Sequence, residues 1–317
     1  MEYKNVGRSD IKISVIGFGC WAMGADESDA GWRNIKHEES IAAVHKALDL
    51  GINFFDTAEA YGDGKSEEVL GQALKGKRDK VVISSKVFRN HLKKEDVLKA
   101  CEASLKRLGT DYLDIYYIHW PNPEVPLSET MGAMAKLKEE GKIKVIGVSN
   151  FDVDQMEECL KIGRIETSQS PYSLFWRHTE DKVIPFCVRN EVGVFAYSPL
   201  AQGLLTGKVT AGQKFDDIRS HNKLFKGKTF EVALQQVERL KKIAQKYGKT
   251  PAQVALNWAS SQQGIISVIA GAKRPSQLEE NLGAVGWELS GEDMSEVGKM
   301  GEAVMDTLED KDPNFFC

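Results

Sequence analysis

The sequence predicts an α/β fold, namely a (β/α)8 TIM barrel with an N-terminal β-hairpin and extra helices near the C-terminus. Short apolar runs alternate with longer amphipathic segments along nearly the whole chain, and eight of these runs have the character of strands. No Gly-x-Gly-x-x-Gly motif opens the first crossover helix, since Gly17-Phe-Gly19 is only a fragment of one, which disfavours a Rossmann domain. We therefore expect a single barrel domain over residues 1–317.

The strand candidates occur in a regular order. Tyr3–Ser14 comes first and is expected to form a hairpin around Gly7-Arg8-Ser9-Asp10. The eight predicted barrel strands are Val15–Gly19, Asn53–Asp56, Val81–Lys86, Leu113–His119, Val145–Ser149, Ile165–Pro171, Val194–Tyr197 and Ser267–Ala270. Their alternation with helices implies a parallel sheet, and eight such units over this length favour a closed barrel.

Helical periodicity marks the segments between the strands. The predicted helices are Glu39–Leu50, Ser66–Leu74, Lys94–Leu108, Ser128–Glu140, Val153–Leu160, Asp181–Asn190, Phe230–Tyr247, Ala252–Ser261, Gln277–Val285 and Gly291–Met300. The third of these places four apolar residues on a single stripe, namely Val97, Cys101, Leu105 and Leu108. Gly141 is expected to act as the C-cap of the fourth helix.

The charge balance argues against a nucleic-acid partner. The net charge is −4, with 42 basic and 46 acidic residues, so no global positive field exists. The basic clusters Lys75-Gly-Lys77-Arg78 and Lys241-Lys242 lie beside helical patterns and indicate solvated faces.

Cysteine usage and hydropathy indicate a cytoplasmic protein. The five cysteines are scattered without a Cys-x-x-Cys motif, so we expect reduced thiols and no metal site. The N-terminal residues Met1–Asn5 lack the apolar run of a signal peptide, and no apolar stretch approaches the roughly 20 residues that span a bilayer. We therefore expect no membrane partner.

Polar residues stand where four consecutive predicted strands end. These residues are Asp56, Lys86, His119 and the pair Ser149-Asn150. Any one of them alone would indicate a helix cap, a solvated lysine or a satisfied rim histidine. Barrel closure brings strand ends together, so a carboxylate, an ammonium, an imidazole and the nearby phenol of Tyr61 are expected in one pocket, a set suited to proton transfer.

These residues belong to an ordered set of motifs. The set comprises Asp56-Thr-Ala-Glu-Ala-Tyr61-Gly62, Ser85-Lys86, Ile118-His119, Gly147-Val-Ser-Asn150, Gln169 and Gly271-Ala-Lys-Arg-Pro-Ser-Gln-Leu-Glu280-Asn281. In order and approximate spacing it resembles the aldo-keto reductase signatures over nearly the whole chain, with details most similar to bacterial members related to the potassium-channel β subunits. The resemblance implies an NADP(H)-dependent reductase of small aldehydes or ketones, and slightly favours a monomer.

The resemblance also implies a role for each residue of the catalytic set. Tyr61 would be the general acid that protonates the carbonyl oxygen as hydride arrives. Lys86 would lower the pKa of the Tyr61 phenol, and Asp56 would hold Lys86 in place and keep it charged. His119 would hydrogen-bond the substrate carbonyl and orient it.

The same resemblance implies which residues bind the cofactor. Those expected at the nicotinamide are Ser149, Asn150 and Gln169 on the carboxamide, and Tyr197 as a stacking platform followed by Ser198, Pro199 and Leu200. Those expected at the adenosine end are Gly271, Ala272, Lys273, Gln277, Glu280 and Asn281. Lys273 and Arg274 favour NADP(H) over NAD(H), although Gln277 stands where many eukaryotic members have an arginine.

Two further features concern the rim of the pocket. The stretch Ser198–Thr229 is long for a barrel loop and contains several glycines, Gly203 among them. It is expected to be a lid over the pyrophosphate with Arg219 as a contact, or else a variable surface excursion. Trp21, Phe88, Trp120 and Trp176 follow strand candidates and either wall an apolar substrate pocket or pack at the rim.

Two rival functions remain open at this stage. An NADP(H)-binding barrel can serve as a redox sensor or regulatory subunit with little turnover, as in the channel β subunits. A Schiff-base aldolase would use Lys86 as nucleophile, but that chemistry needs a lowered lysine pKa, which an ion pair with Asp56 opposes.

Overall fold

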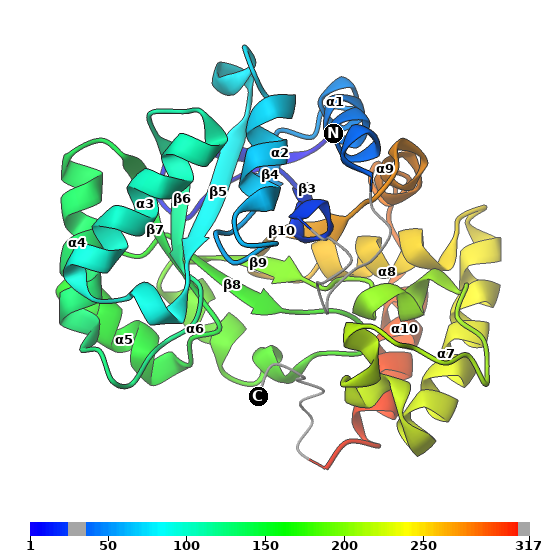
Figure 1. Cartoon of the computed structure of the whole chain (residues 1–317). Helices are drawn as coiled ribbons and strands as arrows, with labels where there is room; N and C mark the ends of the chain where they lie inside the picture. The colour runs from blue at the N-terminus through cyan, green and yellow to red at the C-terminus, as the bar shows by residue number, and fades with distance from the viewer. Residues whose placement is uncertain (25–35, 310–317) are drawn as a thin grey trace.

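The computed structural model describes residues 1–24 and 36–309. Eight parallel strands form a closed barrel, in which the last strand pairs with the first, so the predicted (β/α)8 barrel is confirmed (Figure 1). The strands are β3 (Ile16–Gly19), β4 (Phe54–Asp56), β5 (Val82–Val87), β6 (Leu113–Ile118), β7 (Ile143–Ser149), β8 (Thr167–Pro171), β9 (Gly193–Tyr197) and β10 (Ile265–Gly271). Each lies within one to two residues of its predicted bounds.

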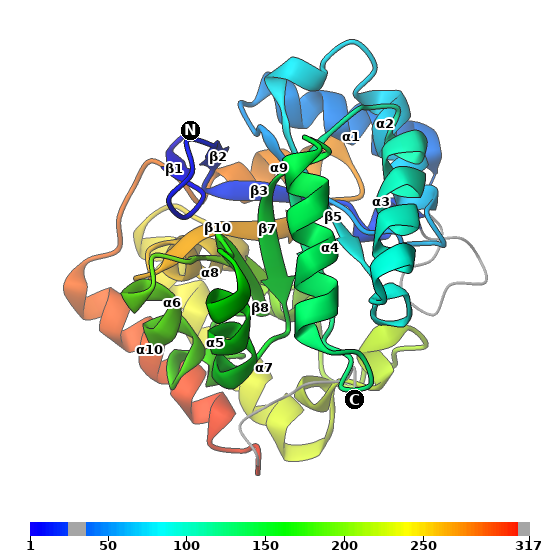
Figure 2. The ribbon, with the colours of Figure 1, turned by 90° about the vertical axis from the view of Figure 1, so that its left-hand side faces the viewer.

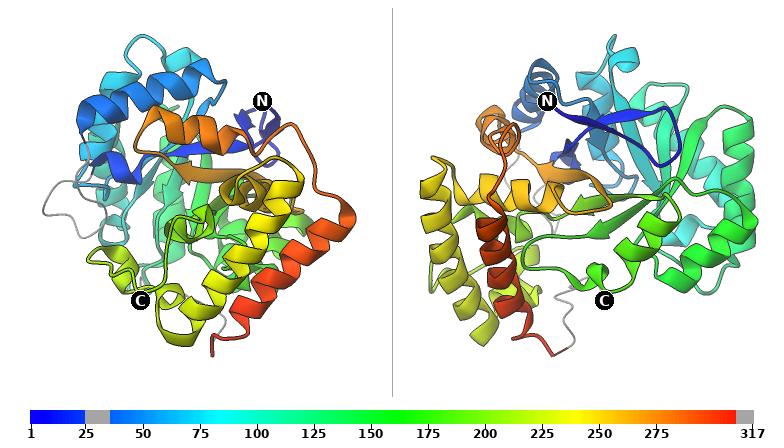
Figure 3. Two further views of the ribbon diagram at one scale, coloured as in Figure 1. Left: turned by 90° about the vertical axis from the view of Figure 1, so that its right-hand side faces the viewer. Right: turned by 180° about the vertical axis from the view of Figure 1, so that it is seen from behind.

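Helices surround the barrel (Figure 2). They are α1 (His37–Asp49), α2 (Lys65–Ala73), α3 (Lys94–Leu108), α4 (Leu127–Glu139), α5 (Val153–Ile162), α6 (Val183–Arg189), α7 (Gly227–Lys246), α8 (Pro251–Ser260), α9 (Pro275–Leu282) and α10 (Gly291–Met305). Helices α7 and α10 lie side by side at one edge of the molecule, as the views in Figure 3 show. In the described part of the chain, no helix combines the length and the apolar character needed to cross a membrane.

Strand alternation separates two apolar cores. Side chains that point outward pack beneath the helices, whereas every second residue fills the barrel interior. Ile115 and Tyr117 point inward, as the spacing from His119 predicts. The hairpin of β1 (Tyr3–Asn5) and β2 (Lys12–Ser14) is confirmed, and its Val6 and Ile13 join the interior cluster. The barrel interior is therefore a packed core, which leaves the carboxyl ends of the strands for a site.

Some helices differ from their predicted bounds: α7 begins at Gly227 rather than Phe230, and α10 continues to Met305 rather than Met300. Helix α6 begins at Val183 rather than Asp181, because a 3-10 turn over His178–Glu180 precedes it. The long connection between β9 and α7 contains 3-10 turns at Ala201–Thr206, Ile218–Ser220 and Lys223–Phe225. Residues of this connection, Gly203 and Arg219 among them, line the cavity at the carboxyl ends of the strands.

Candidate active site

A cavity of about 730 Å³ opens at the carboxyl ends of the barrel strands. Residues at or near the ends of six strands line it, namely Gly19, Asp56, Ser149, Gln169, Tyr197 and Gly271. Enzymes with this fold carry their catalytic groups at this face, because the strand ends converge there. Its volume lies within the range of pockets that bind small molecules and cofactors.

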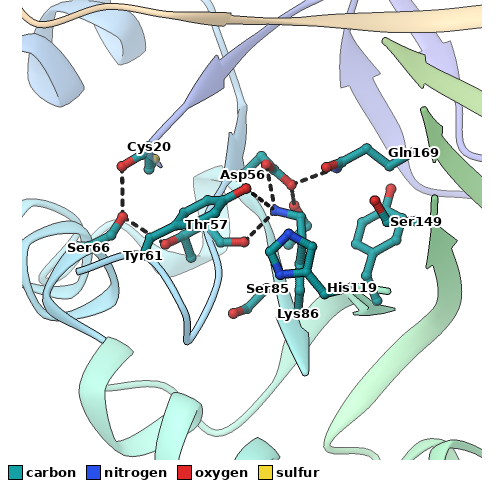
Figure 4. Close-up of polar contacts among 12 residues, drawn as sticks. Cys20, Asp56, Thr57, Tyr61, Ser66, Ser85, Lys86, His119, Ser149 and Gln169 are labelled. Atoms are coloured by element: carbon teal, nitrogen blue, oxygen red, sulfur yellow. Dashed lines mark hydrogen bonds and ion pairs between the residues drawn. The ribbon is translucent and has the colours of Figure 1, made fainter. Parts of the chain in front are cut away.

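Lys86 lies at the centre of the polar contacts beneath this cavity (Figure 4). Its side chain is fully buried, and its Nζ donates to Asp56 Oδ2 at 2.7 Å and to the Thr57 carbonyl at 2.7 Å. The third donation goes to the Tyr61 hydroxyl at 3.2 Å. All three protons of the ammonium thus have acceptors.

Asp56 is fixed through both carboxylate oxygens. One oxygen, Oδ2, binds Lys86, and the other, Oδ1, accepts from Ser84 Oγ at 2.7 Å and Gln169 Nε2 at 2.9 Å. The register of β4 against β5 places Asp56 beside Ser84. These bonds satisfy a buried carboxylate that would otherwise be costly to desolvate.

The pKa of Lys86 is set by two opposing effects. Burial lowers the pKa below its ordinary value, because desolvation penalises the ammonium, while the Asp56 carboxylate opposes this shift. The expectation that Asp56 keeps Lys86 charged is therefore met only in part.

Tyr61 differs from the expectation in its acidity. Burial raises the pKa of its phenol well above the ordinary value, and the negative charge of Asp56 raises it further. The net shift of this pKa is therefore upward, because desolvation of the phenolate outweighs any stabilisation of the phenolate by the Lys86 ammonium. Tyr61 accordingly carries its proton at neutral pH, which is the form that a proton donor requires.

His119 stands beside Tyr61 in the cavity wall. Its ring meets the Tyr61 ring edge-on, with 5.7 Å between centroids, and meets the Phe88 ring in the same way at 5.6 Å. Burial lowers the pKa of His119 well below its ordinary value, and the charge of Lys86 adds to this shift. His119 is therefore neutral at physiological pH, and its buried Nδ1 has no partner among the described residues.

Tyr197 forms another part of the wall and is held in place from behind. Its hydroxyl donates to Asn150 Oδ1 at 2.8 Å, and Asn150 Nδ2 donates to Ser149 Oγ and to the His119 carbonyl, both at 3.0 Å. The Trp176 and Tyr197 rings pack in a T-shaped arrangement, with 6.2 Å between centroids. The ring thus presents a fixed aromatic surface to the cavity.

The polar residues expected at a carboxamide all line the cavity, and all three have partners within the protein, since Ser149 Oγ accepts from Asn150 Nδ2. Asn150 bonds to Tyr197, and Gln169 donates to Asp56 across 113 residues of sequence. The remaining backbone and side-chain positions expected at a cofactor, Ser198, Pro199, Leu200, Gly203, Gly271, Ala272 and Asn281, line the cavity as well.

Two cations gather across the mouth from Lys86. Arg219 and Lys273 both line the cavity, and burial lowers the pKa of Lys273, with the charge of Arg219 adding to the shift. Arg219 forms a forked ion pair with Asp217, at 2.9 Å from Nε to Oδ1 and 2.5 Å from the guanidinium nitrogen to Oδ2. The Asp217 carboxylate also acts on Lys273 and opposes the lowering of its pKa.

Near the start of α9, Gln277 and Glu280 line the cavity, and both also have partners within the protein. Gln277 Oε1 accepts from the backbone nitrogens of Lys273 at 2.7 Å and Arg274 at 3.2 Å, so it braces the loop. Arg274 does not line the cavity. Glu280 does, and it accepts from Lys208 at 3.1 Å.

Three of the four expected aromatic residues line the cavity: Trp21, Phe88 and Trp120. Trp21 tilts toward Tyr61, with 6.2 Å between ring centroids. The expectation for Trp176 is wrong, since this side chain is fully buried and lies behind Tyr197. A tight turn, closed by backbone bonds between Ser173 and Trp176, carries its ring away from the cavity.

Sequence reasoning missed several contributors. Ser84 lies two residues before Lys86 and therefore on the same face of the strand, so the sequence could have predicted that it lies near Asp56. Thr57 accepts a hydrogen bond through its backbone carbonyl, and Asp217 forms an ion pair with Arg219 within a loop. No sequence pattern predicts either contact.

The geometry also bears on alternative chemistry. Lys86 is buried behind the cavity wall with three hydrogen bonds, an arrangement unsuited to attack on a carbonyl, although its lowered pKa removes one argument against an aldolase. Within residues 1–24 and 36–309, no cluster of three or more His, Cys, Asp or Glu side chains is placed to hold a metal ion.

Known proteins are similar to this chain in sequence and fold. Among curated relatives, aldo-keto reductase YhdN of Bacillus subtilis (strain 168) is 39% identical, with 95% of this chain and 94% of that protein covered. The NADH-specific methylglyoxal reductase of Escherichia coli (strain K12) is 34% identical (94% and 98% covered), and a probable voltage-gated potassium channel subunit beta of Arabidopsis thaliana is 35% identical (90% and 91% covered).

Solved structures and a family model agree with these relatives. A glycerol dehydrogenase from Gluconobacter oxydans superposes with a TM-score of 0.88 at 31% identity, covering 99% of both chains. An aldo-keto reductase from Klebsiella pneumoniae in complex with NADPH superposes with a TM-score of 0.77 at 35% identity, covering 95% of both chains. The model of the aldo/keto reductase family matches residues 15–302. By its sequence, its barrel and these relatives, the chain belongs to the aldo/keto reductase family.

Proposed function

We propose that the protein reduces small aldehydes and ketones with NADP(H), with Tyr61 as the general acid. The observation that carries this proposal is the bond from Lys86 Nζ to the Tyr61 hydroxyl at the wall of a large cavity, with Asp56 fixed behind the lysine. A protonated phenol backed by an ammonium suits proton donation to a carbonyl oxygen that gains negative charge.

The residues present fit a nicotinamide dinucleotide. Tyr197 offers a braced aromatic surface beside the catalytic residues, and Ser149 lies next to it in the cavity wall. Arg219 and Lys273 stand across the mouth, where they would hold phosphate groups, and this pair is the basis for preferring NADP(H) over NAD(H). When bound, the cofactor supplies the hydride.

The protein's own groups would then act on the substrate. His119, neutral because of its lowered pKa, would donate a hydrogen bond to the carbonyl oxygen and orient it. Tyr61 would pass its proton to that oxygen as the carbonyl carbon accepts hydride, which yields an alcohol. Lys86 would stabilise the phenolate left on Tyr61, and Asp56 would keep the ammonium in position.

The test is the loss of reduced-nicotinamide absorbance with purified protein, NADPH or NADH, and a panel of aldehydes and ketones that includes methylglyoxal. We expect turnover of several aldehydes, with a higher kcat/KM for NADPH. Turnover with NADH alone would contradict the cofactor preference. The E. coli relative named as an NADH-specific methylglyoxal reductase is an example of that opposite preference. Absence of turnover with either nucleotide would contradict the reductase proposal.

A regulatory subunit is the second candidate, and the similarity to plant proteins named as probable potassium-channel β subunits favours it. Tight NADPH binding with negligible turnover on the whole panel would support this role. Rapid turnover of many aldehydes would count against it.

A further inference from the structure

Arg89 is a cationic side chain in the wall of the cavity, three residues beyond Lys86. It begins the 3-10 turn Arg89–His91 and lines the cavity next to Phe88, whose ring contacts His119. We infer that Arg89 selects carbonyl substrates that carry a carboxylate, an inference that rests on the proposed reductase function.

The backbone at Arg89 is anchored on both sides. Asn122 Nδ2 donates to the Arg89 carbonyl at 3.0 Å, and the Phe88 nitrogen donates to Glu59 Oε1 at 2.6 Å. The same Glu59 oxygen lies 3.0 Å from His91 Nδ1, so this neighbouring carboxylate is already engaged. The turn therefore holds the base of the Arg89 side chain at a fixed place on the cavity rim.

The Arg89 guanidinium has no intramolecular counter-charge in the part of the chain that the structure describes: no hydrogen bond or ion pair of this group occurs there. The two acidic residues that line the cavity are both committed, because Asp56 binds Lys86 and Glu280 binds Lys208. An anion supplied by a ligand would thus be the partner of this arginine.

Position in the barrel separates Arg89 from the other cations of the cavity. Arg89 follows β5, whereas Lys208 and Arg219 follow β9, and β5 and β9 are four strands apart in the closed order of eight. Lys273 follows β10, which is next to β9. The cofactor phosphates would occupy the β9–β10 side, which leaves Arg89 on the side of Tyr61 and His119 for the substrate.

The chemistry of the wall defines the substrate class. The guanidinium offers a planar fork of donors that matches a carboxylate in two parallel bonds. The aromatic side chains of Trp21, Phe88 and Trp120 belong to the same cavity lining as Arg89 and Tyr61. These features fit an aldehyde with an apolar body and a carboxylate remote from the carbonyl.

The test compares charged and neutral aldehydes with saturating NADPH. One pair is 4-carboxybenzaldehyde and methyl 4-formylbenzoate, and a second, flexible pair is succinic semialdehyde and butanal. In the wild-type protein, at least one pair should show a preference for the carboxylate of about five- to tenfold in kcat/KM, mainly through KM. Arg89→Gln should abolish this preference while leaving turnover of the neutral aldehydes unchanged.

Two controls distinguish a direct effect of Arg89 on the substrate from the overall electrostatic field of the protein. Arg189→Gln removes an exposed arginine at the end of α6, at the opposite face of the barrel, and should retain the preference. Raising the salt concentration should weaken the preference, because the Arg89 side chain is exposed.

Two results would overturn the inference. One is equal kcat/KM for the charged and neutral members of both pairs, and the other is a preference that persists in Arg89→Gln. If the neutral aldehydes are reduced in either case, the reductase function stands and only the role of Arg89 fails. If no aldehyde is reduced, both proposals fail together.

Discussion

Tyr61 is the single residue on which the proposed chemistry depends most. Its hydroxyl receives a hydrogen bond from Lys86 and retains its own proton, because burial raises its pKa. Tyr61→Phe removes only the hydroxyl, so we expect kcat for aldehyde reduction to fall by about 10²- to 10⁴-fold. NADPH affinity, measured by fluorescence titration, should change little, and a variant with near wild-type turnover would show that Tyr61 is not the acid.

The pH dependence of reduction follows from two buried groups. A lysine is charged below its pKa, so the Lys86 ammonium is lost as pH rises through a pKa that burial has lowered. We therefore expect kcat/KM to fall on the alkaline side, at a pH below that of an ordinary lysine, with this limb absent in Lys86→Met.

On the acidic side of the pH profile, kcat/KM should show no decrease caused by protonation of His119. Because burial and Lys86 lower its pKa well below the ordinary value, His119 stays neutral through the range in which a free histidine titrates. A profile of kcat/KM against pH on the wild-type protein measures this directly. A limb near the ordinary histidine pKa that disappears in His119→Gln would contradict the assignment.

The loop after β9 and the segment that leads into α9 form the side of the cavity at which the cofactor phosphates are expected. Lys273 stands next to Arg219 with a lowered pKa, so removing its charge should weaken binding of a 2′-phosphate. We expect Lys273→Met to raise the Kd for NADPH about tenfold and to leave the Kd for NADH nearly unchanged. Lys299→Met, on the exposed face of α10, should change neither Kd.

Strand β7 contains a glycine that the packing of the barrel interior requires. A Cβ at Gly147 would lie 2.4 Å from the Tyr117 ring and 2.9 Å from the Thr167 methyl group. We expect Gly147→Ala to destabilise the protein by about 1–3 kcal/mol, measured by urea unfolding. Gly132→Ala in α4, where a Cβ meets nothing within 4 Å, should be neutral or stabilising, and equal effects at both sites would contradict the packing argument.

At the scale of the elements, periodicity was sufficient to predict the order of the strands and helices, although not the bounds of every helix. Helix α3 was predicted at its observed bounds, because its apolar stripe and the left-handed Gly109 that follows it are local features. The turns at Ala201–Thr206 and Ile218–Ser220 lack periodicity and were not predictable. They depend on single contacts, such as the cap that Asp217 provides to Arg219.

At the scale of the whole molecule, the barrel was predictable and its interior electrostatics were not. Strand ends must converge in a closed barrel, so the proximity of Asp56, Lys86 and His119 followed from their positions. The choice of Gln169 as a partner of Asp56, and the sign of the Tyr61 pKa shift, depend on burial and long-range packing. These properties arise only when the chain is folded.

In the proposed reaction, the cavity couples hydride delivery from the cofactor to proton donation by Tyr61. The most direct measurement is the stoichiometry of alcohol formed to NADPH consumed, with methylglyoxal or an aromatic aldehyde as substrate. We predict one alcohol for each NADPH, over many turnovers for each protein molecule. NADPH that binds tightly while no alcohol forms would contradict the claim.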